Sequence, residues 1–238
     1  MFIPNRTRVM GVSATIKINV NDKIYLRDPE QTQLGKKIIS SSIELIDELG
    51  FEDFTFKKLA NRINSTEASI YRYFENKHNL LVYLLVWYWS WLEYQIDYQT
   101  NNIEDVEKRL KIAIRVIAES LTPKGESHFQ HIDEVALHRI VVSESSKTYY
   151  TKSVDTENQF GFFRSYKSLC KKVASMIKSY NADYPYAHAL TSTMLESAHQ
   201  QIFFSQHLPS LTELKVTDTE TEEIIKYLEQ LIFKQIQK

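Results

Sequence analysis

Residues 55–77 read TFKKLANRINSTEASIYRYFENK, and this stretch decides the fold. Thr55 can cap a short helix, because its hydroxyl can accept the free backbone N–H groups of the first turn. The apolar side of that helix would consist of Phe56, Leu59, Ala60 and Ile63. Asn64 suits the left-handed position that ends a helix, and Ser65 or Thr66 can cap a second short helix. Two short helices joined by a tight turn form a helix-turn-helix.

A longer helix is predicted before this motif. Apolar residues recur there at spacings of three and four: Leu34, Ile38, Ile39, Ile43, Leu45, Ile46 and Leu49. Gly50 follows as a helix stop. After the motif, Asn76 can cap a fourth helix that begins at Lys77 and runs to about residue 99. The sequence therefore predicts three helices and then a long fourth one.

This pattern resembles the DNA-binding domain of the tetracycline-repressor (TetR) family of bacterial regulators, over residues 34–85. The link GFEDFTF, residues 50–56, also resembles the family's connection between its first two helices. The matching residues of the motif are Leu59, Ala60, Thr66, Ile70, Tyr71, Tyr73, Phe74 and Lys77. The resemblance implies an all-α protein, with an N-terminal three-helix helix-turn-helix domain and a C-terminal helical bundle that binds a ligand and forms a homodimer.

The outward side chains of the motif are the candidate contacts to double-stranded DNA. Hydroxyls, lysines and helix N-termini suit phosphates. The phosphate candidates are Thr55, Thr66, Tyr71, Tyr73 and Lys77, with electrostatic support from Lys57 and Lys58. The candidates for reading bases are Glu67, Ala68, Ser69 and Arg72. Among these, Arg72 can pair bidentately with guanine, and Ala68 can contact a thymine methyl group.

Two positions depart from the family's pattern. Asn64 stands where the family usually has glycine, and asparagine tolerates that backbone conformation. Glu67 stands where the family often has a basic, polar or small residue. A carboxylate in the first turn of a helix is favourable to the helix dipole. Facing DNA it repels phosphate, but it can accept a hydrogen bond from cytosine. Glu67 is therefore either a reader of cytosine or a residue that only caps the helix and weakens DNA binding.

Composition limits the remaining possibilities. The chain has 238 residues, 43 % of them hydrophobic and 25 % charged, which is ordinary for a folded globular protein. Only 5 Gly and 5 Pro interrupt it, which favours helices. Its net charge of −1 excludes a purely electrostatic DNA binder, although residues 1–80 hold 12 Lys and Arg against 10 Asp and Glu. The longest apolar run, residues 80–92, is too short to span a bilayer, and we expect a cytoplasmic protein.

The segment before the first helix predicts a short β-hairpin. Apolar residues alternate at Ile16, Ile18 and Val20 and again at Ile24 and Leu26, with a turn at residues 21–22. A lone hairpin is marginal in water, so it must pack against the domain. Two roles stay open for it: a strap over the neighbouring helices, or an arm that reaches DNA beside the main contact.

Beyond residue 100 the sequence predicts five further helices, at 103–121, 129–142, 156–180, 185–207 and 216–236. Aromatic side chains are frequent here and on the fourth helix. They serve either as packing between the domains or as walls of an apolar effector pocket. The candidate pocket residues are Trp87, Trp91, Tyr94, Phe163, Tyr166 and Phe203. For the dimer contact that the resemblance implies, residues 156–180 and 185–207 are the candidates, with the last helix as the competitor.

Neither a catalytic motif nor a metal motif is found, so we expect no enzyme, no cofactor and no metal. His128, His131, Glu134 and His138 share a helical face, but they lack a known zinc pattern and fit a row of surface or pocket-lining histidines. Cys170 lies among apolar residues, as a buried small hydrophobe does.

These predictions divide the chain into an N-terminal extension (1–30), a DNA-binding domain (31–78) and a helical ligand-binding and dimerisation domain (79–238). The leading hypothesis is a one-component transcriptional regulator that binds a palindromic operator as a dimer and is released, or otherwise modulated, by a small apolar effector. The resemblance implies that it is a repressor relieved by its effector. The alternative is a ligand-binding or interaction protein of the same fold that binds no operator.

Overall fold

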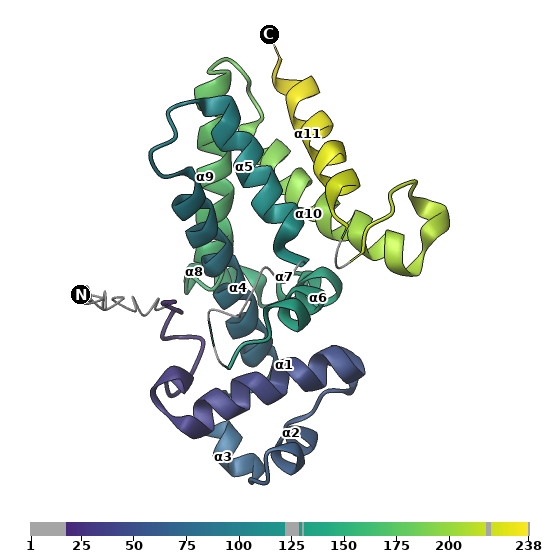
Figure 1. The fold of residues 1–238 in the computed structure, drawn as a ribbon. Coiled ribbons are helices and arrows are strands. Elements are labelled where there is room, and N and C mark those ends of the chain that lie inside the picture. Colours follow the sequence, from purple (N-terminus) through teal and green to yellow (C-terminus); the bar gives the residue numbers. More distant parts are fainter. Residues whose placement is uncertain (1–17, 122–128, 130, 218–219, 238) are drawn as a thin grey trace, which may run out of the picture.

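The computed structural model describes residues 18–121, 129, 131–217 and 220–237. Across these residues every regular element is a helix, so the all-α prediction is confirmed. A small bundle of three helices lies beneath a longer helical bundle, and the fourth helix joins the two (Figure 1). These four helices are α1 (Gln33–Asp53), α2 (Phe56–Arg62), α3 (Glu67–Tyr71) and α4 (Lys77–Thr100).

Side-chain caps fix where the first helices begin, as predicted. The hydroxyls of Thr55 and Thr66 and the side chain of Asn76 each accept the backbone N–H three residues further on. Asn64 has a φ of 52°, the left-handed conformation predicted for the turn between α2 and α3. Gly50 has a φ of 76°, which kinks α1 before its last residues. The predicted stop at Gly50 is therefore a break within α1 rather than its end.

The long helix α4 is the centre of the molecule. Its side chains from Leu80 to Trp89 are all buried, because neighbours cover every side of it. Those neighbours are α5 (Val106–Ala118), α6 (Glu134–Glu144) and α9 (Arg164–Tyr180). The described helices include none that is both long enough and apolar enough to cross a bilayer.

The later helices follow the prediction, with shifted boundaries. The predicted helix at 156–180 is two helices, α8 (Val154–Gln159) and α9, because Gly161 adopts a φ of 83° between them. Asp105 and Asp133 cap α5 and α6, so these helices begin later than the apolar pattern suggested. The remaining elements are α7 (Ser146–Tyr149), α10 (Ala187–His207), α11 (Glu222–Ile236) and three short 3₁₀ segments, η1 (Pro29–Gln31), η2 (Glu119–Leu121) and η3 (Pro209–Leu211).

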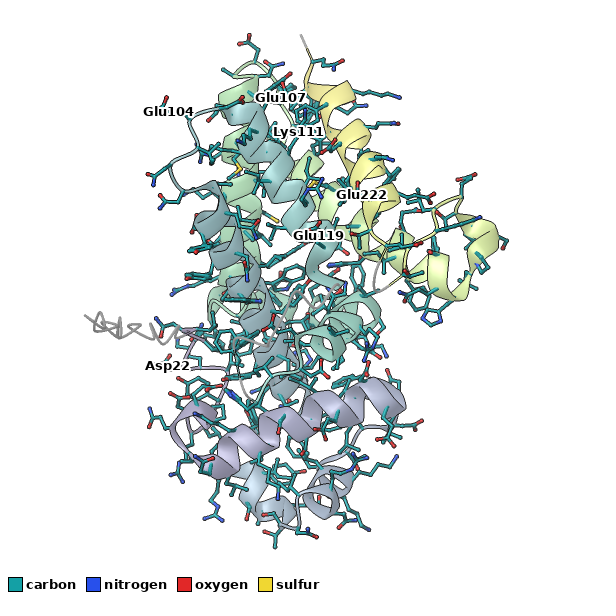
Figure 2. All side chains as sticks on the ribbon, viewed as in Figure 1. Asp22, Glu104, Glu107, Lys111, Glu119 and Glu222 are labelled. Carbon is teal, nitrogen blue, oxygen red and sulfur yellow. The ribbon has the colours of Figure 1, made fainter. Side chains whose placement is uncertain are left out.

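The outward side of α5 carries a row of charges. Lys111 donates to Glu107 at 2.6 Å, and Arg115 lies between Glu119 of η2 at 3.1 Å and Glu222 of α11 at 3.4 Å. Figure 2 shows this row running down α5 beside the start of α11. Ion pairs near the surface, such as these, contribute little stability each.

The predicted β-hairpin is wrong for its described part, and Ile16 lies outside the described residues. Residues 18–28 form an irregular segment without strands, which we call the strap. Ile24 of the strap is fully buried, and Tyr25 packs edge-to-face on Tyr83 of α4. The backbone N–H of Leu26 donates to the carbonyl of Tyr73, so contacts to the helical domain replace pairing between strands. Figure 2 places Asp22 of the strap on the flank of the molecule, between the two bundles.

Candidate nucleic-acid interface and effector site

The end of the molecule formed by α2 and α3 presents a polar surface. The side chains of Thr55, Lys57, Thr66, Glu67, Ala68, Tyr71 and Arg72 are all exposed there. Figure 1 shows α2 and α3 at the end of the molecule opposite the C-terminus. Most of the predicted DNA contacts are thus brought together on one accessible face.

Arg72 is held in place on this surface by a short polar chain. Its Nη2 donates to Ser69 Oγ at 3.2 Å, and Ser69 Oγ lies 3.0 Å from Thr66 Oγ1. Ser69 is buried, so its hydroxyl orients Arg72 instead of facing the DNA side. The prediction of Ser69 as a residue that reads bases is therefore corrected to a positioning role.

The two tyrosines of the motif differ in the same way. Tyr71 is 48 % exposed, and its ring packs edge-to-face on Phe56 at 5.0 Å between centroids. Tyr73 is only 2 % exposed, and its hydroxyl lies 2.7 Å from Thr32 Oγ1 at the start of α1. Tyr71 can reach a phosphate, whereas Tyr73 joins α3 to α1. The prediction of Tyr73 as a DNA contact is corrected for this reason.

The side chain of Lys77 forms its hydrogen bonds within the DNA-binding domain. Its ammonium donates to the carbonyls of Phe51, Glu52 and Phe54, at 2.9, 3.0 and 3.2 Å. It also lies over the ring of Phe51 at 4.7 Å. Carbonyls at the end of a helix lack partners within the helix, and Lys77 satisfies three of them where α1 meets α4. These bonds favour a structural role for Lys77, and its predicted phosphate contact stays a prediction.

Three polar contacts join α1 to α6 and α7, the side of the upper bundle that faces the DNA-binding domain. Arg139 binds Asp47 with two hydrogen bonds, at 2.8 and 2.6 Å. The backbone N–H of Phe51 donates to Glu144 Oε1 at 3.2 Å. Lys147 donates to Glu52 at 2.9 Å, and this hydrogen bond lowers the pKa of Glu52. A shift of α6 would therefore move α1 directly through these contacts.

The six predicted pocket residues do not line one cavity within the described part of the chain. Trp87 and Trp91 pack edge-to-face on Phe129, and Tyr94 stacks on the outer side of Trp91. Phe203 lies elsewhere, in a groove of about 390 Å³ between α1, α6 and α10. Of the six, only Phe163 and Tyr166 share a recess formed by described residues. The prediction that joined all six is corrected, because α4 is buried on every side and its aromatic side chains point in different directions.

Phe163 and Tyr166 line a narrow crevice against α4. Its walls are Val82, Leu85, Val86, Trp89, Thr148, Tyr149, Phe162, Phe163 and Tyr166. Tyr149 and Tyr166 also border a wide open groove of about 1070 Å³ along α8, α9 and α10. Both tyrosine hydroxyls donate to the same oxygen of Glu196, at 3.0 and 2.8 Å. These two tyrosines thus stand between the outer groove and the inner crevice.

A polar cluster lies in the core between α4, α6 and α10. Tyr88 donates to Ser120, Ser120 donates to the carbonyl of Ile117, and His138 Nδ1 lies 2.7 Å from the Tyr88 oxygen. Since both hydroxyl hydrogens are committed, this arrangement favours a hydrogen on Nδ1 of His138 and leaves Nε2 as an acceptor. His138 Nε2 and His199 Nδ1 are both buried and have no hydrogen-bond partner among the described residues, and the two rings lie 6.1 Å apart.

Burial keeps both histidines of this cluster neutral. It lowers the pKa of His138 well below its ordinary value and lowers the pKa of His199 to about 4, against an opposing effect of Glu196. Tyr88, Trp89 and His199 were missed as candidate site residues, because a polar side chain on a buried helix gives no periodic signal. His131 is not part of this cluster, since it pairs with Glu30 at 2.8 Å, and His128 lies outside the described residues. Burial also raises the pKa of the Cys170 thiol to about 11.

Comparison with known proteins agrees with this geometry. Residues 38–84 match the profile described as bacterial regulatory proteins of the tetR family. These residues therefore form a domain of the TetR N-terminal type. The matched residues comprise most of α1, all of α2 and α3, and the start of α4, which together form the surface described above. Among curated protein sequences, nothing matches the chain.

Solved structures share the fold over most of their length and of this chain. AibR, crystallised with isovaleryl coenzyme A and operator DNA, has a TM-score of 0.54 at 16 % identity, over 84 % of this chain and 99 % of AibR. The fatty acid degradation regulator FadR from Bacillus halodurans gives 0.54 at 17 %, over 82 % and 96 %. A transcriptional regulator from Rhodococcus sp. Rha1 gives 0.55 at 14 %, over 89 % and 97 %. These similarities show that the chain shares the overall fold of these three regulators over 82–89 % of its length.

Proposed function

We propose that this protein is a one-component transcriptional regulator of the TetR family that binds a palindromic operator as a homodimer. The observation that supports this most is α3. A helix of five residues is a poor structural element, yet Thr66 caps it and Ser69 orients its arginine. Glu67, Ala68 and Arg72 remain exposed on it. A guanidinium held in a fixed position suits bidentate recognition of guanine.

A dimer follows from the length of this helix. A five-residue helix contacts few base pairs, so one copy gives little specificity. A two-fold dimer would present two recognition helices about 34–36 Å apart, or at a multiple of that spacing, on one side of the DNA. We place the dimer contact on α9 and α10, which border the wide open groove. The DNA-binding domain is then residues 31–78, and residues 79–238 bind the effector and the second copy.

The effector site is proposed at the aromatic crevice and the histidine cluster. Trp89 links the two, because its ring contacts both Tyr166 of the crevice and His199 of the cluster. A mainly apolar wall with a few polar groups suits a small apolar or aromatic molecule. The AibR structure contains isovaleryl coenzyme A together with operator DNA, so this fold can hold an organic ligand and DNA at once.

Helix α6 provides the physical coupling between effector and DNA. His138 faces the buried cluster, and the next residue, Arg139, binds Asp47 of α1. An effector that displaces His138 therefore shifts Arg139, and with it α1 and the recognition surface. An effector that stabilises the displaced state lowers the affinity for the operator by its differential affinity for the two states.

Binding to a pool of random 30-base-pair duplexes tests the DNA-binding claim, with affinity measured by fluorescence anisotropy between 50 and 200 mM salt. We expect salt-dependent binding, and a flatter dependence for Lys57→Gln, since each lost phosphate contact reduces the slope by about 0.9. Lys108→Gln is the matched control, because Lys108 is equally exposed but lies on α5. Equal slopes for all three proteins, or no binding at all, would refute the proposal and favour a ligand-binding protein that has lost its operator.

A further inference from the structure

The strap contacts both the upper helical bundle and the DNA-binding domain. Near the upper bundle, Asn21 Nδ2 donates to the carbonyl of Phe160 at 2.8 Å, and Lys23 lies over the Phe160 ring at 4.8 Å. Near the DNA-binding domain, the N–H of Leu26 donates to the carbonyl of Tyr73 at 2.8 Å. Figure 1 shows the strap descending along the flank to the start of α1. The strap therefore ends directly beside the recognition helix.

Arg27 occupies the position where the strap meets this helix. Its guanidinium lies over the ring of Tyr73, 5.5 Å from the centroid, which is within the range of a cation–π interaction. Tyr73 itself is fixed by its hydroxyl contact with Thr32, so the ring is a rigid platform. Arg27 is exposed. A buried tyrosine thus holds a cation at the surface where the strap meets the residues that follow α3.

The charge on Arg27 is not paired with a carboxylate in the part of the chain that the structure describes. Arg62 and Arg139, on the same domain or facing it, are ion-paired with Glu48 and Asp47. Arg27 and Arg72 have no carboxylate within 4.0 Å among the described residues. The carboxylate of the neighbouring Asp28 is engaged in capping η1, where it accepts the N–H of Glu30 and the side chain of Gln31. Two unpaired guanidinium groups therefore lie at one end of α3.

We propose that Arg27 is a further DNA contact, supplied by the strap, which binds a backbone phosphate beside the bases read by α3. A guanidinium suits a phosphate because it donates two parallel hydrogen bonds. Tyr73 acts as a positioning residue in this arrangement: it holds Arg27 through its ring and makes no DNA contact itself. This inference rests on the proposed DNA-binding function, and it makes the strap part of the DNA-binding surface.

The test measures the salt dependence of binding to the same random duplex pool for Arg27→Gln and Lys23→Gln. Lys23 is the matched control, because it is an exposed cation of the same strap that lies over Phe160 instead of Tyr73. We expect Arg27→Gln to reduce the slope by about 0.9 and Lys23→Gln to leave it unchanged. Arg27→Lys, which keeps the charge, should restore most of the slope.

The role of Tyr73 is tested separately. Tyr73→Phe keeps the ring, so the slope should stay at the wild-type value, although the contact with Thr32 is lost. Tyr73→Leu removes the aromatic ring under Arg27 and should reduce the salt dependence of DNA binding even though Arg27 is present. The Phe variant remains informative if the Leu variant does not fold.

Each outcome decides between the two claims. A wild-type slope that Arg27→Gln leaves unchanged overturns this inference and leaves the proposed function intact. An equal loss in Lys23→Gln also overturns it, because the effect would then be general electrostatics. Absence of salt-dependent binding in the wild-type protein overturns the proposed function and this inference together.

Discussion

Replacement of Lys77 by methionine distinguishes a structural role of this lysine from a role in DNA binding. The ammonium donates to three carbonyls at the end of α1, at 2.9, 3.0 and 3.2 Å, and lies over the Phe51 ring. Methionine keeps a similar apolar stem but removes the donor. Hydrogen bonds to a charged group contribute about 1.5–3 kcal/mol, and a cation at a helix C-terminus contributes roughly 0.3–1 kcal/mol more. Because Lys77 is partly exposed, we expect a loss of about 2–3 kcal/mol in the free energy of unfolding.

For a chain of this length, 1 kcal/mol corresponds to about 2–4 °C in Tm. Lys77→Met should therefore lower Tm by roughly 5–10 °C in differential scanning calorimetry, at one protein concentration for all variants. Lys58→Met is the matched control, because Lys58 is exposed and donates to one carbonyl only, that of Asp53; its Tm should change by less than half as much.

The same variants are measured on DNA. The salt dependence of binding should be the same for Lys77→Met and the wild-type protein. An unchanged Tm together with a slope reduced by about 0.9 would show that Lys77 contacts a phosphate, and the structural role assigned here would be wrong.

Three further predictions follow from named contacts. The free energy of unfolding should fall by up to about 3 kcal/mol between pH 6.5 and 4, because the unfolded chain protonates His199 at its ordinary pKa while the folded chain does so only near pH 4. The lowered pKa of His138 acts in the same direction. Urea titrations that show no decline for the wild type, or the same decline for His199→Gln, would contradict this. Gly35→Ala should lower the free energy of unfolding by about 1–3 kcal/mol in the same titrations, because the new Cβ would lie 2.2 Å from the carbonyl oxygen of Pro29. A change below roughly 0.5 kcal/mol, as expected for an unconstrained surface site, would show that η1 moves freely. Arg72→Ala should relax the sequence preference in selection from random duplexes, while Lys57→Gln should weaken binding to all sequences alike; the reverse pattern would show that these two roles are assigned wrongly.

The DNA-binding domain could be predicted from the sequence because its signals are local. Caps at Thr55, Thr66 and Asn76, and the left-handed turn at Asn64, are fixed by residues within a few positions of one another. The roles of Tyr73 and Lys77 could not be predicted in this way. Their partners, Thr32 and the end of α1, are more than 20 residues away, and only packing decides whether a side chain of the motif faces outward or back into the domain.

In the C-terminal half, too, local sequence signals predicted the helices but not which side chains meet. Helices were found, but their starts depend on Asp105 and Asp133, and one helix is divided at Gly161. The effector residues were grouped on helical spacing alone. Since α4 is surrounded by neighbours, side chains on a single helix enter several different contacts, as Trp89 and Trp91 do. The strap was mistaken for a hairpin because alternation of apolar residues also describes an extended segment that packs on helices.

Selection of bound sequences from random duplex DNA tests the central claim most directly. The full-length protein, shown to be folded and dimeric, is used at about 100 mM salt, where non-specific binding is already weakened. The account predicts an enriched palindrome whose half-site centres lie about one helical turn, or a multiple of it, apart, with a sequence preference that is relaxed in Arg72→Ala. Random sequences after repeated rounds, or the same enriched motif with Arg72→Ala, would contradict recognition of an operator by α3.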